Sequence, residues 1–167
     1  MFRVAILTVS DRSAQGVRAD ASGAVIHELI GAALTADVVA YRVVPDEQPQ
    51  IAAVLREWAD AHIADVILTT GGTGLAPRDV TPEATRAVIE REVPGIPEAM
   101  RAASLKVTPF AMLSRMVAGT RGRTLIINLP GSPKGVRENL VVVLPALAHG
   151  LDKLRGDPSD CAPPAAE

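Results

Sequence analysis

The segment Leu68-Thr-Thr-Gly-Gly-Thr-Gly-Leu-Ala-Pro-Arg-Asp-Val-Thr-Pro-Glu83 predicts a buried strand, a glycine turn and the start of a helix. Its loop Gly71-Gly72-Thr73-Gly74 has three glycines in four positions. Glycine has no Cβ atom to shield the backbone N–H groups, so an anion can approach them closely. Thr73 adds a hydroxyl group, Arg78 a guanidinium group for phosphate and Asp79 a carboxylate for Mg²⁺. The segment therefore predicts a phosphate-binding site.

Two common phosphate-binding fingerprints do not fit this loop. A P-loop requires a Gly-Lys-Ser or Gly-Lys-Thr sequence after its first glycine, and no lysine occurs between Gly71 and Thr81. A dinucleotide-binding fingerprint requires glycine or alanine at the position of Pro77. Taken alone, the loop is also consistent with an ordinary strand-to-helix turn whose glycines adopt positive φ. The other motifs of the chain distinguish a phosphate-binding loop from an ordinary turn.

The composition indicates one domain that binds neither nucleic acid nor a membrane. A length of 167 residues is typical of a single domain. A net charge of −2 and only four aromatic residues argue against a nucleic-acid partner. The longest apolar run, Leu140 to Ala148, contains Pro145 and has nine residues, whereas a membrane-spanning helix needs about 20. Without a signal peptide's long apolar stretch at the N-terminus, we expect a cytoplasmic protein.

The single cysteine and the three histidines predict no site of their own. Cys161 lies in Gly156–Glu167, a segment poor in bulky apolar residues, which we expect to be a flexible tail. It has no partner for a disulfide, and we expect it to have no function. The histidines are scattered singly along the chain, without the spacing of a metal site.

Strand-like and helix-like segments alternate along the chain. Four runs predict strands: Val4–Val9, Val38–Val44, Asp65–Thr69 and Thr124–Leu129. Their nearly continuous apolar character is typical of a sheet that is covered on both faces. Apolar residues between them follow the helical period in two stripes: Ile51, Val54, Leu55, Trp58 and Ala59, and Val25, Ile26, Leu29, Ile30, Ala33 and Leu34. The pattern predicts a doubly wound, mostly parallel α/β fold in one domain over residues 1–155.

Prolines and capping residues predict where the later helices begin and end. Thr81-Pro82-Glu83 is typical of an N-cap, a proline at the first helical position and an acidic residue in the first turn. Pro94 to Pro97 should break this helix, and residues 98–106 should form the next one. Ser132-Pro133 repeats the cap-and-proline start, and we expect Pro145 to divide the helical segment that follows into two.

Polar residues follow the end of each predicted strand. They are Ser10-Asp11-Arg12-Ser13, Pro45-Asp46-Glu47, the glycine loop and Pro130-Gly-Ser-Pro-Lys-Gly135. In an open parallel sheet, ligands bind beyond the carboxyl ends of the strands. The four segments together therefore predict a single crevice.

Each of these polar residues also has a purely structural interpretation. Asp46 could cap a helix that begins near Pro49, Ser132 could cap its own helix, and Asp11-Arg12 could be a solvated ion pair. As a set they favour a ligand site.

The types of side chain in the set are those that bind a metal and phosphate groups. Asp46 and Asp79 would hold Mg²⁺, while Arg78 and Lys134 would neutralise phosphate groups. The N-terminus of the helix after Ser132 would bind a further anion.

Five motifs taken in order resemble the MoaB/Mog family of molybdenum cofactor biosynthesis proteins. They are Thr8-Val-Ser-Asp-Arg12, Val44-Pro-Asp-Glu47, Thr69-Thr-Gly-Gly-Thr-Gly74, Arg78-Asp-Val-Thr-Pro-Glu-Ala84 and Asn128-Leu-Pro-Gly-Ser-Pro-Lys134. The resemblance extends from about Val4 to Leu154. It implies a molybdopterin adenylyltransferase, which uses Mg-ATP to adenylylate the terminal phosphate of molybdopterin and releases pyrophosphate. It also implies a trimer and hand-over of the product to the molybdate-inserting protein.

The resemblance implies a role for each matching residue. Asp79 would be the metal-binding and catalytic carboxylate and Asp46 its partner. Gly71, Gly72, Thr73 and Gly74 would hold the nucleotide phosphates. The residues that line the adjoining nucleotide and pterin positions would be Ser10, Asp11, Gly131 and Ser132.

Two further expectations follow from the same resemblance. Asn139-Leu-Val141 runs directly into Leu144, without the insert that some members carry, and this compact form resembles members that bind the pterin without transferase activity. A non-catalytic pterin-binding or carrier protein is therefore the alternative function. The 48% share of hydrophobic residues permits more apolar surface than one core needs around Glu98–Val107, Met112-Leu113 and Met116-Val117. We expect a subunit interface there, with burial in the monomer's own core as the alternative for any one residue.

Overall fold

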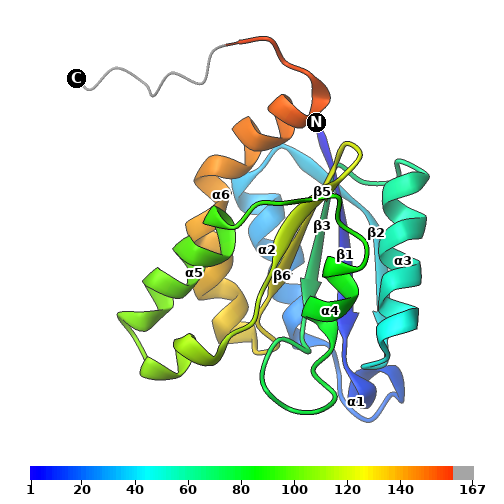
Figure 1. Ribbon diagram of the computed structural model, residues 1–167, viewed down its shortest axis with the longest axis vertical. Helices are drawn as coiled ribbons and strands as arrows, with labels where there is room; N and C mark the ends of the chain where they lie inside the picture. The colour runs from blue at the N-terminus through cyan, green and yellow to red at the C-terminus, as the bar shows by residue number, and fades with distance from the viewer. Residues whose placement is uncertain (160–167) are drawn as a thin grey trace.

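The strands form one six-stranded sheet in the order β2-β1-β3-β6-β5-β4 in the computed structural model (Figure 1), which describes residues 1–159. Four strands run parallel: β1 (Phe2–Val9), β2 (Ala36–Val44), β3 (Val66–Thr70) and β6 (Thr124–Leu129). Two antiparallel strands, β5 (Ala118–Arg121) and β4 (Arg91–Glu92), complete one edge. Cys161 and most of the predicted tail lie outside the described residues.

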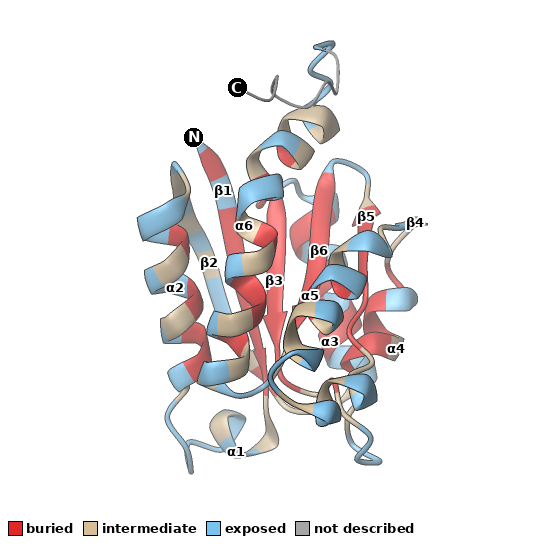
Figure 2. Cartoon of the chain, turned by 90° about the vertical axis from the view of Figure 1, so that its left-hand side faces the viewer, coloured by how far each residue is buried: buried red, intermediate tan, exposed pale blue. Residues whose placement is uncertain are grey.

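Helices cover both faces of the sheet (Figures 1 and 2). One face carries α2 (Ala21–Ala33), α5 (Gly95–Leu105) and α6 (Pro133–Arg155), and the other carries α3 (Gln48–Asp60) and α4 (Thr81–Arg86). A separate apolar core fills the space between the sheet and each helical layer. Two short elements, α1 (Asp11–Ala14) and the 3₁₀ helix η1 (Pro109–Leu113), lie in loops. The doubly wound, mostly parallel α/β fold is thus confirmed.

The four predicted strands are present, but the two antiparallel strands were not predicted. Every residue of β3 and β6 is buried, as expected for central strands covered on both faces. β5 has four residues, including Gly119, and β4 has only two. Such short segments carry little strand signal, and a glycine weakens it further. Among residues 1–159, no helix has both the length and the apolar character of a membrane span.

The predicted start of α4 is wrong by one residue. Val80, not Thr81, is the N-cap residue, and Thr81 is the first residue of the helix. The Thr81 hydroxyl group instead donates a hydrogen bond of 2.9 Å to the carbonyl oxygen of Gly71. This buried bond ties the helix to the glycine loop, so the hydroxyl group satisfies the Gly71 carbonyl oxygen instead of capping the helix.

The predicted effects of three prolines also need correction. α4 ends at Arg86, well before Pro94, and α5 begins at Gly95 with Pro97 inside its first turn. First-turn N–H groups have no partner within a helix, so proline costs little there. Pro145 does not divide α6, which is one continuous helix of 23 residues. The buried side chains of this helix on both sides of Pro145 pack on the same core, and this packing outweighs the lost hydrogen bond.

The predicted surplus of apolar surface is only partly present. Met116 and Val117 are buried in the core of the single chain, so their assignment to a subunit interface is wrong. Phe110, Met112 and Leu113, which lie on η1, are exposed.

An ion-pair cluster at the amino ends of the strands joins the two ends of the chain. The buried carboxylate of Asp65 accepts hydrogen bonds from Arg3 of β1 and from Arg155 at the end of α6, the latter at 2.8 Å. The Arg155 guanidinium group also lies over the Phe2 ring, 4.5 Å from its centroid. Although burial opposes it, these hydrogen bonds lower the pKa of Asp65 from 3.8 to about 2.

We predict that Asp65→Asn removes an acid-sensitive part of the stability. A carboxylate whose pKa is lower in the folded than in the unfolded state stabilises the protein above its unfolded pKa, and this contribution disappears as the pH falls through the folded pKa. The wild type should therefore lose about 2 kcal/mol of unfolding free energy between about pH 5 and pH 2. Urea unfolding across this range should show a flatter acid limb for the variant.

The matched control is Asp60→Asn, which breaks an exposed pair with Arg121. An exposed ion pair contributes little to stability, so this variant should follow the wild type. Parallel acid limbs for the wild type and Asp65→Asn would contradict the assignment.

Candidate functional site

The ends of the four parallel strands surround one cavity of about 380 Å³, which we call the strand-end pocket. Seven of the predicted site residues line it: Ser10, Asp46, Gly71, Gly72, Asp79, Gly131 and Ser132. They come from the loops that follow β1, β2, β3 and β6, so the predicted crevice is present. Parallel strands bring these loops together because their carboxyl ends lie at the same edge of the sheet.

A second cavity of about 520 Å³ adjoins the first, and we call it the side pocket. Thr73, Gly74 and Lys134 line it, and Ser132 lines both cavities. Arg101 and Ser104 of α5 and the exposed Phe110 of η1 form part of its wall. The structure therefore distributes ten of the twelve predicted residues over two adjoining cavities, whereas Asp11 and Arg78 line neither.

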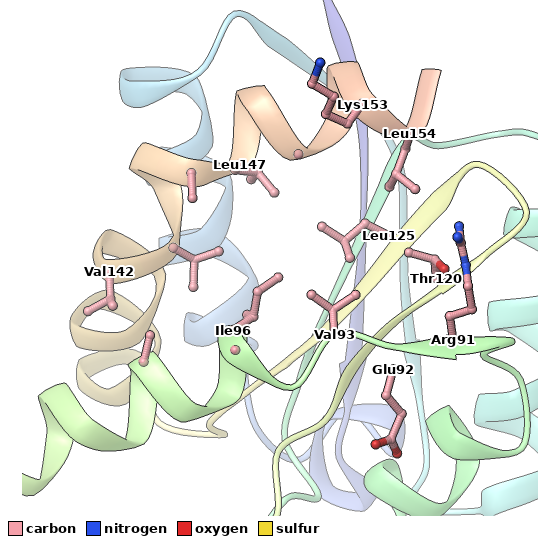
Figure 3. Close-up of a pocket in the computed structure, with 15 residues that line it drawn as sticks. Arg91, Glu92, Val93, Ile96, Thr120, Leu125, Val142, Leu147, Lys153 and Leu154 are labelled. Carbon is pink, nitrogen blue, oxygen red and sulfur yellow. The ribbon is translucent and has the colours of Figure 1, made fainter. Parts of the chain in front are cut away.

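A third, larger cavity of about 650 Å³ lies away from these residues, between α5 and α6. Figure 3 shows apolar side chains such as Ile96, Leu125 and Leu147 around it. None of the predicted site residues line this cavity. This mostly apolar cavity is therefore not the predicted phosphate-binding site.

Asp46 and Asp11 hold the first two loops together through a pair of reciprocal hydrogen bonds. The Asp11 amide donates to Asp46 Oδ2 at 2.8 Å, and the Asp46 amide donates to Asp11 Oδ1 at 3.0 Å. The N-cap residue of α3 is Glu47 and makes no side-chain cap, so the interpretation of Asp46 as a helix cap is wrong. Burial raises the pKa of Asp46, and the nearby negative charges of Asp11 and Asp79 raise it further.

Arg78 binds carboxylates from two of the loops. Its Nε and Nη2 atoms lie 2.7 and 2.9 Å from the Asp11 carboxylate, and Nη2 also lies 2.8 Å from Glu47 Oε1. The hydrogen bonds from Arg78 lower the pKa of Asp11. The predicted ion pair between Asp11 and Arg12 is therefore wrong, because Asp11 pairs with Arg78.

The glycine loop needs glycine at Gly72 for two reasons. Its φ of 63° lies in the left-handed region, where a Cβ atom is strained. A Cβ atom there would also lie 2.4 Å from Thr81 Oγ1 and 3.1 Å from Asp46 Oδ1. The absence of a side chain thus allows the loop to lie directly against Asp46.

Asp79 closes the end of this loop, and its conformation is fixed by the backbone. Its Oδ2 atom accepts a hydrogen bond of 2.8 Å from the Ala76 amide, and its own amide donates to the Ala76 carbonyl oxygen at 2.8 Å. Asp79 and Asp46 both line the strand-end pocket and interact electrostatically.

Arg115 was not predicted, yet it holds the loop from the opposite side. Its Nε atom donates to the Gly74 carbonyl oxygen at 2.7 Å, its Nη2 atom donates to the Asp79 carbonyl oxygen, and its Nη1 atom pairs with Glu83. Its amide also donates to the Thr73 carbonyl oxygen at 3.0 Å. The sequence separation of Arg115 from the loop explains why no local pattern identified it.

Two other residues of the strand-end pocket, Asp20 and Arg18, were also missed. Asp20 is the N-cap of α2 and accepts hydrogen bonds from the Thr8 and Tyr41 hydroxyl groups at 2.5 and 2.7 Å. Although burial opposes it, the hydrogen bonds to Asp20 lower the pKa of its carboxyl group. Asp20 directly precedes α2 and lies five residues before the predicted apolar stripe, so it was a usable capping signal.

Arg18 lines the same pocket and is exposed. Within residues 1–159 it makes no side-chain hydrogen bond or ion pair, and no other Lys or Arg lines this pocket. No sequence pattern pointed to it.

Comparison with known proteins assigns the chain to a family. A family model described as a probable molybdopterin binding domain matches residues 5–149. The chain belongs to this family. The resemblance to molybdenum cofactor biosynthesis proteins is thereby confirmed.

Individual relatives agree with this assignment. The structure of the molybdopterin biosynthesis enzyme MoaB from Thermus thermophilus is 57% identical, with a TM-score of 0.89, over 96% of this chain and 100% of that one. Molybdopterin adenylyltransferase from Helicobacter pylori strain J99 is 44% identical over 93% of this chain and 89% of the relative. Gephyrin from Dictyostelium discoideum is 45% identical over 96% of this chain, which spans only 23% of gephyrin's length.

We predict that Gly72→Ala weakens nucleotide binding because the new Cβ atom has to displace Thr81 or Asp46. Gly122→Ala is the matched control, since Gly122 also has a positive φ, of 54°, but has no atom within 4 Å of an added Cβ. Both variants should lose about 1 kcal/mol of stability from backbone strain, and Gly72→Ala should lose more because its Cβ atom also meets Thr81 and Asp46. Only Gly72→Ala should lower the affinity for Mg-ATP in calorimetric titration. Equal affinities for both variants would place the nucleotide elsewhere.

Proposed function

We propose that this protein is a molybdopterin adenylyltransferase that acts in molybdenum cofactor biosynthesis. It transfers AMP from Mg-ATP to the terminal phosphate of molybdopterin and releases pyrophosphate. The observation that carries the proposal is the placement of Asp46, Asp79 and the glycine loop around one cavity. The name of the H. pylori relative supports the same activity.

The carboxylates of the strand-end pocket fit a magnesium ion bound together with the nucleotide. Burial and the neighbouring acids raise the pKa of Asp46, so a cation beside it is electrostatically favoured. Within residues 1–159 no group of three or more His, Cys, Asp or Glu side chains is placed to hold a metal, which favours two carboxylates completed by phosphate oxygens and water. Asp46 and Asp79 would hold Mg²⁺. When bound, this ion would neutralise part of the negative charge of the phosphates.

The protein's own groups position the reactants. In the proposed step, an oxygen of the pterin phosphate forms a bond to the α-phosphorus of ATP, and the bond between the α-phosphorus and the bridging oxygen breaks to release pyrophosphate. The amide of Gly72 and the side chain of Arg18 bind the nucleotide phosphates beside Asp46 and Asp79, while the Gly71 amide donates to the Leu129 carbonyl oxygen. Arg115 holds the loop in place through the Gly74 and Asp79 carbonyl oxygens. Positioning and charge stabilisation account for most catalysis of phosphate transfer.

The two adjoining cavities suit two substrates. The strand-end pocket, with its carboxylates and glycines, would take the nucleotide phosphates, with Ser10 and Asp11 beside them. The side pocket, lined by Thr73 and Lys134, would take the pterin, and Gly131 and Ser132 lie next to the boundary between them. Arg78 already binds Asp11 and Glu47, so its role is to hold the loops rather than to contact phosphate.

The wider setting is proposed on the same basis. We propose a homotrimer, with the exposed apolar side chains of η1 among those that contact a second copy. ATP as the donor fits a cytoplasmic location, and the product fits hand-over to a molybdate-inserting protein.

The direct test is incubation of the purified protein with molybdopterin, ATP and Mg²⁺, with the product detected by mass. Adenylylated pterin that depends on all three additions is the expected result. Binding of the pterin without any adenylylated product would favour a pterin carrier instead.

We predict that Asp79→Asn folds normally but loses activity by about 100-fold or more, because an amide cannot replace the charge of a metal-binding carboxylate. Asp46→Asn should have the same effect. Turnover should be measured at saturating ATP and Mg²⁺, with circular dichroism as the check on folding. Turnover within a few-fold of the wild type would contradict the metal-ligand assignment.

We predict that Arg18→Ala raises the KM for Mg-ATP by about tenfold, because a charged hydrogen bond to phosphate contributes about 1.5 kcal/mol or more. Arg12→Ala is the control, since Arg12 is an exposed arginine nearby that does not line the pocket. Steady-state kinetics should leave Arg12→Ala unchanged. The same KM for both variants would mean that Arg18 does not reach the phosphates.

A further inference from the structure

A fourth cavity, with polar walls, lies at the amino ends of the parallel strands, opposite the strand-end pocket. It has a volume of about 450 Å³ and is lined by Arg3, Arg123 and Arg155 around Asp65, and we call it the arginine pocket. Arg3 lies near the start of β1, Asp65 directly precedes β3, Arg123 lies in the turn between β5 and β6, and Arg155 ends α6. In Figure 1 these segments lie at the top and α1 at the bottom, so the two pockets are at opposite ends of the strands.

Asp65 fixes the positions of two of the three guanidinium groups. Arg3 Nη2 lies 3.2 Å from Asp65 Oδ1, and Arg155 Nη2 lies 2.8 Å from Asp65 Oδ2. Backbone carbonyl oxygens hold the same groups from the side: Arg3 Nη1 donates to His62 at 2.7 Å, and Arg155 Nη2 donates to Met1 at 3.0 Å. Two arginine side chains are therefore ordered before any ligand arrives, which lowers the entropic cost of binding one.

The arginine pocket has more positive than negative charge. Three guanidinium groups and one carboxylate leave two positive charges, although the whole chain has a net charge of −2. Arg123 is exposed and, within the described part of the chain, makes no ion pair and no side-chain hydrogen bond. The nearby acid Glu90 accepts a hydrogen bond from the Gly122 amide and does not line the pocket. Asp65 alone cannot neutralise the cluster.

The unused hydrogen-bond donors of the cluster match an oxyanion. Each guanidinium group offers five N–H donors in a planar fork, and such forks bind carboxylate and phosphate oxygens in pairs. Arg155 Nε and Nη1 and all the side-chain nitrogens of Arg123 form no hydrogen bond within the described residues. A polynucleotide would need a long basic stripe, whereas this is one small cluster of three arginines.

We propose that the arginine pocket is a second ligand site, which binds a small dianion of the phosphate class, either free phosphate or a phosphate group on a small molecule. Two phosphate oxygens accept hydrogen bonds from N–H groups of Arg123 and Arg155. The negative charge of the ligand balances the excess positive charge of the cluster. The site does not depend on the proposed transferase activity, because it shares no residue with the strand-end or side pocket.

The test is a titration of the isotope-labelled full chain with inorganic phosphate, followed by amide NMR at constant ionic strength against chloride. We expect saturable shifts at the amides of Gly122, Arg123 and Thr124, separate from any shifts at Gly71 and Gly72. Pyrophosphate and a sugar phosphate, titrated in parallel, distinguish a free anion from a phosphate group carried by a metabolite. Arg123→Ala should weaken phosphate binding at Gly122 and Thr124 by about tenfold or more.

Arg91→Ala is the matched control, since Arg91 is another exposed arginine that lies outside the pocket. It should leave the phosphate affinity unchanged. Because Arg123 makes no side-chain hydrogen bond or ion pair among residues 1–159, Arg123→Ala should keep the wild-type melting temperature. Equal phosphate affinities for Arg123→Ala and the wild type would overturn the proposal, as would shifts that chloride reproduces or shifts confined to the glycine loop.

Discussion

The common direction of β1, β2, β3 and β6 is the constraint on which the rest of the structure depends. Parallel strands place all their carboxyl ends, and the loops that follow, at one edge of the sheet. Residues as distant in sequence as Ser10 and Ser132 therefore line one cavity. The same direction gathers the amino ends at the other edge, where Asp65 joins β1 to the end of α6. Three carboxylates and one guanidinium group line the strand-end pocket, whereas three guanidinium groups and one carboxylate line the arginine pocket, so the two pockets have opposite net charge.

Electrostatics explain why the carboxyl edge is suited to a cation and phosphate groups. Asp20, Asp46 and Asp79 line the strand-end pocket, and Arg18 is the one Lys or Arg side chain among the described residues that lines it. Burial and like charges raise the pKa of Asp46, whereas hydrogen bonds hold the pKa of Asp20 low. A bound divalent cation offsets the two net negative charges of this lining, so that a polyphosphate can bind beside the carboxylates. The charges of the strand-end pocket therefore favour a divalent cation together with phosphate groups.

Much of this arrangement could be predicted from the sequence, and the failures have physical causes. The parallel strands and both apolar stripes were predictable because burial on two faces leaves a continuous pattern. Convergence of Asp46, Asp79 and the glycine loop followed from the rule for parallel sheets. Arg115 could not be found because the loop that it holds is distant in sequence, and Arg18 could not be found because only the folded chain places it at the strand-end pocket. Pro145 was misjudged because local preference for a helix break is weaker than the packing of α6 on the core.

We propose that Asp46 and Asp79 together hold the metal of a bound nucleotide. A crystal structure with Mn²⁺ in place of Mg²⁺ and a non-hydrolysable ATP analogue tests it most directly, because Mn²⁺ can be located by its anomalous scattering. The account predicts one metal coordinated by carboxylate oxygens of both residues and by phosphate oxygens, with the phosphates against Gly71 and Gly72. A metal bound only to phosphate, away from both carboxylates, would contradict it.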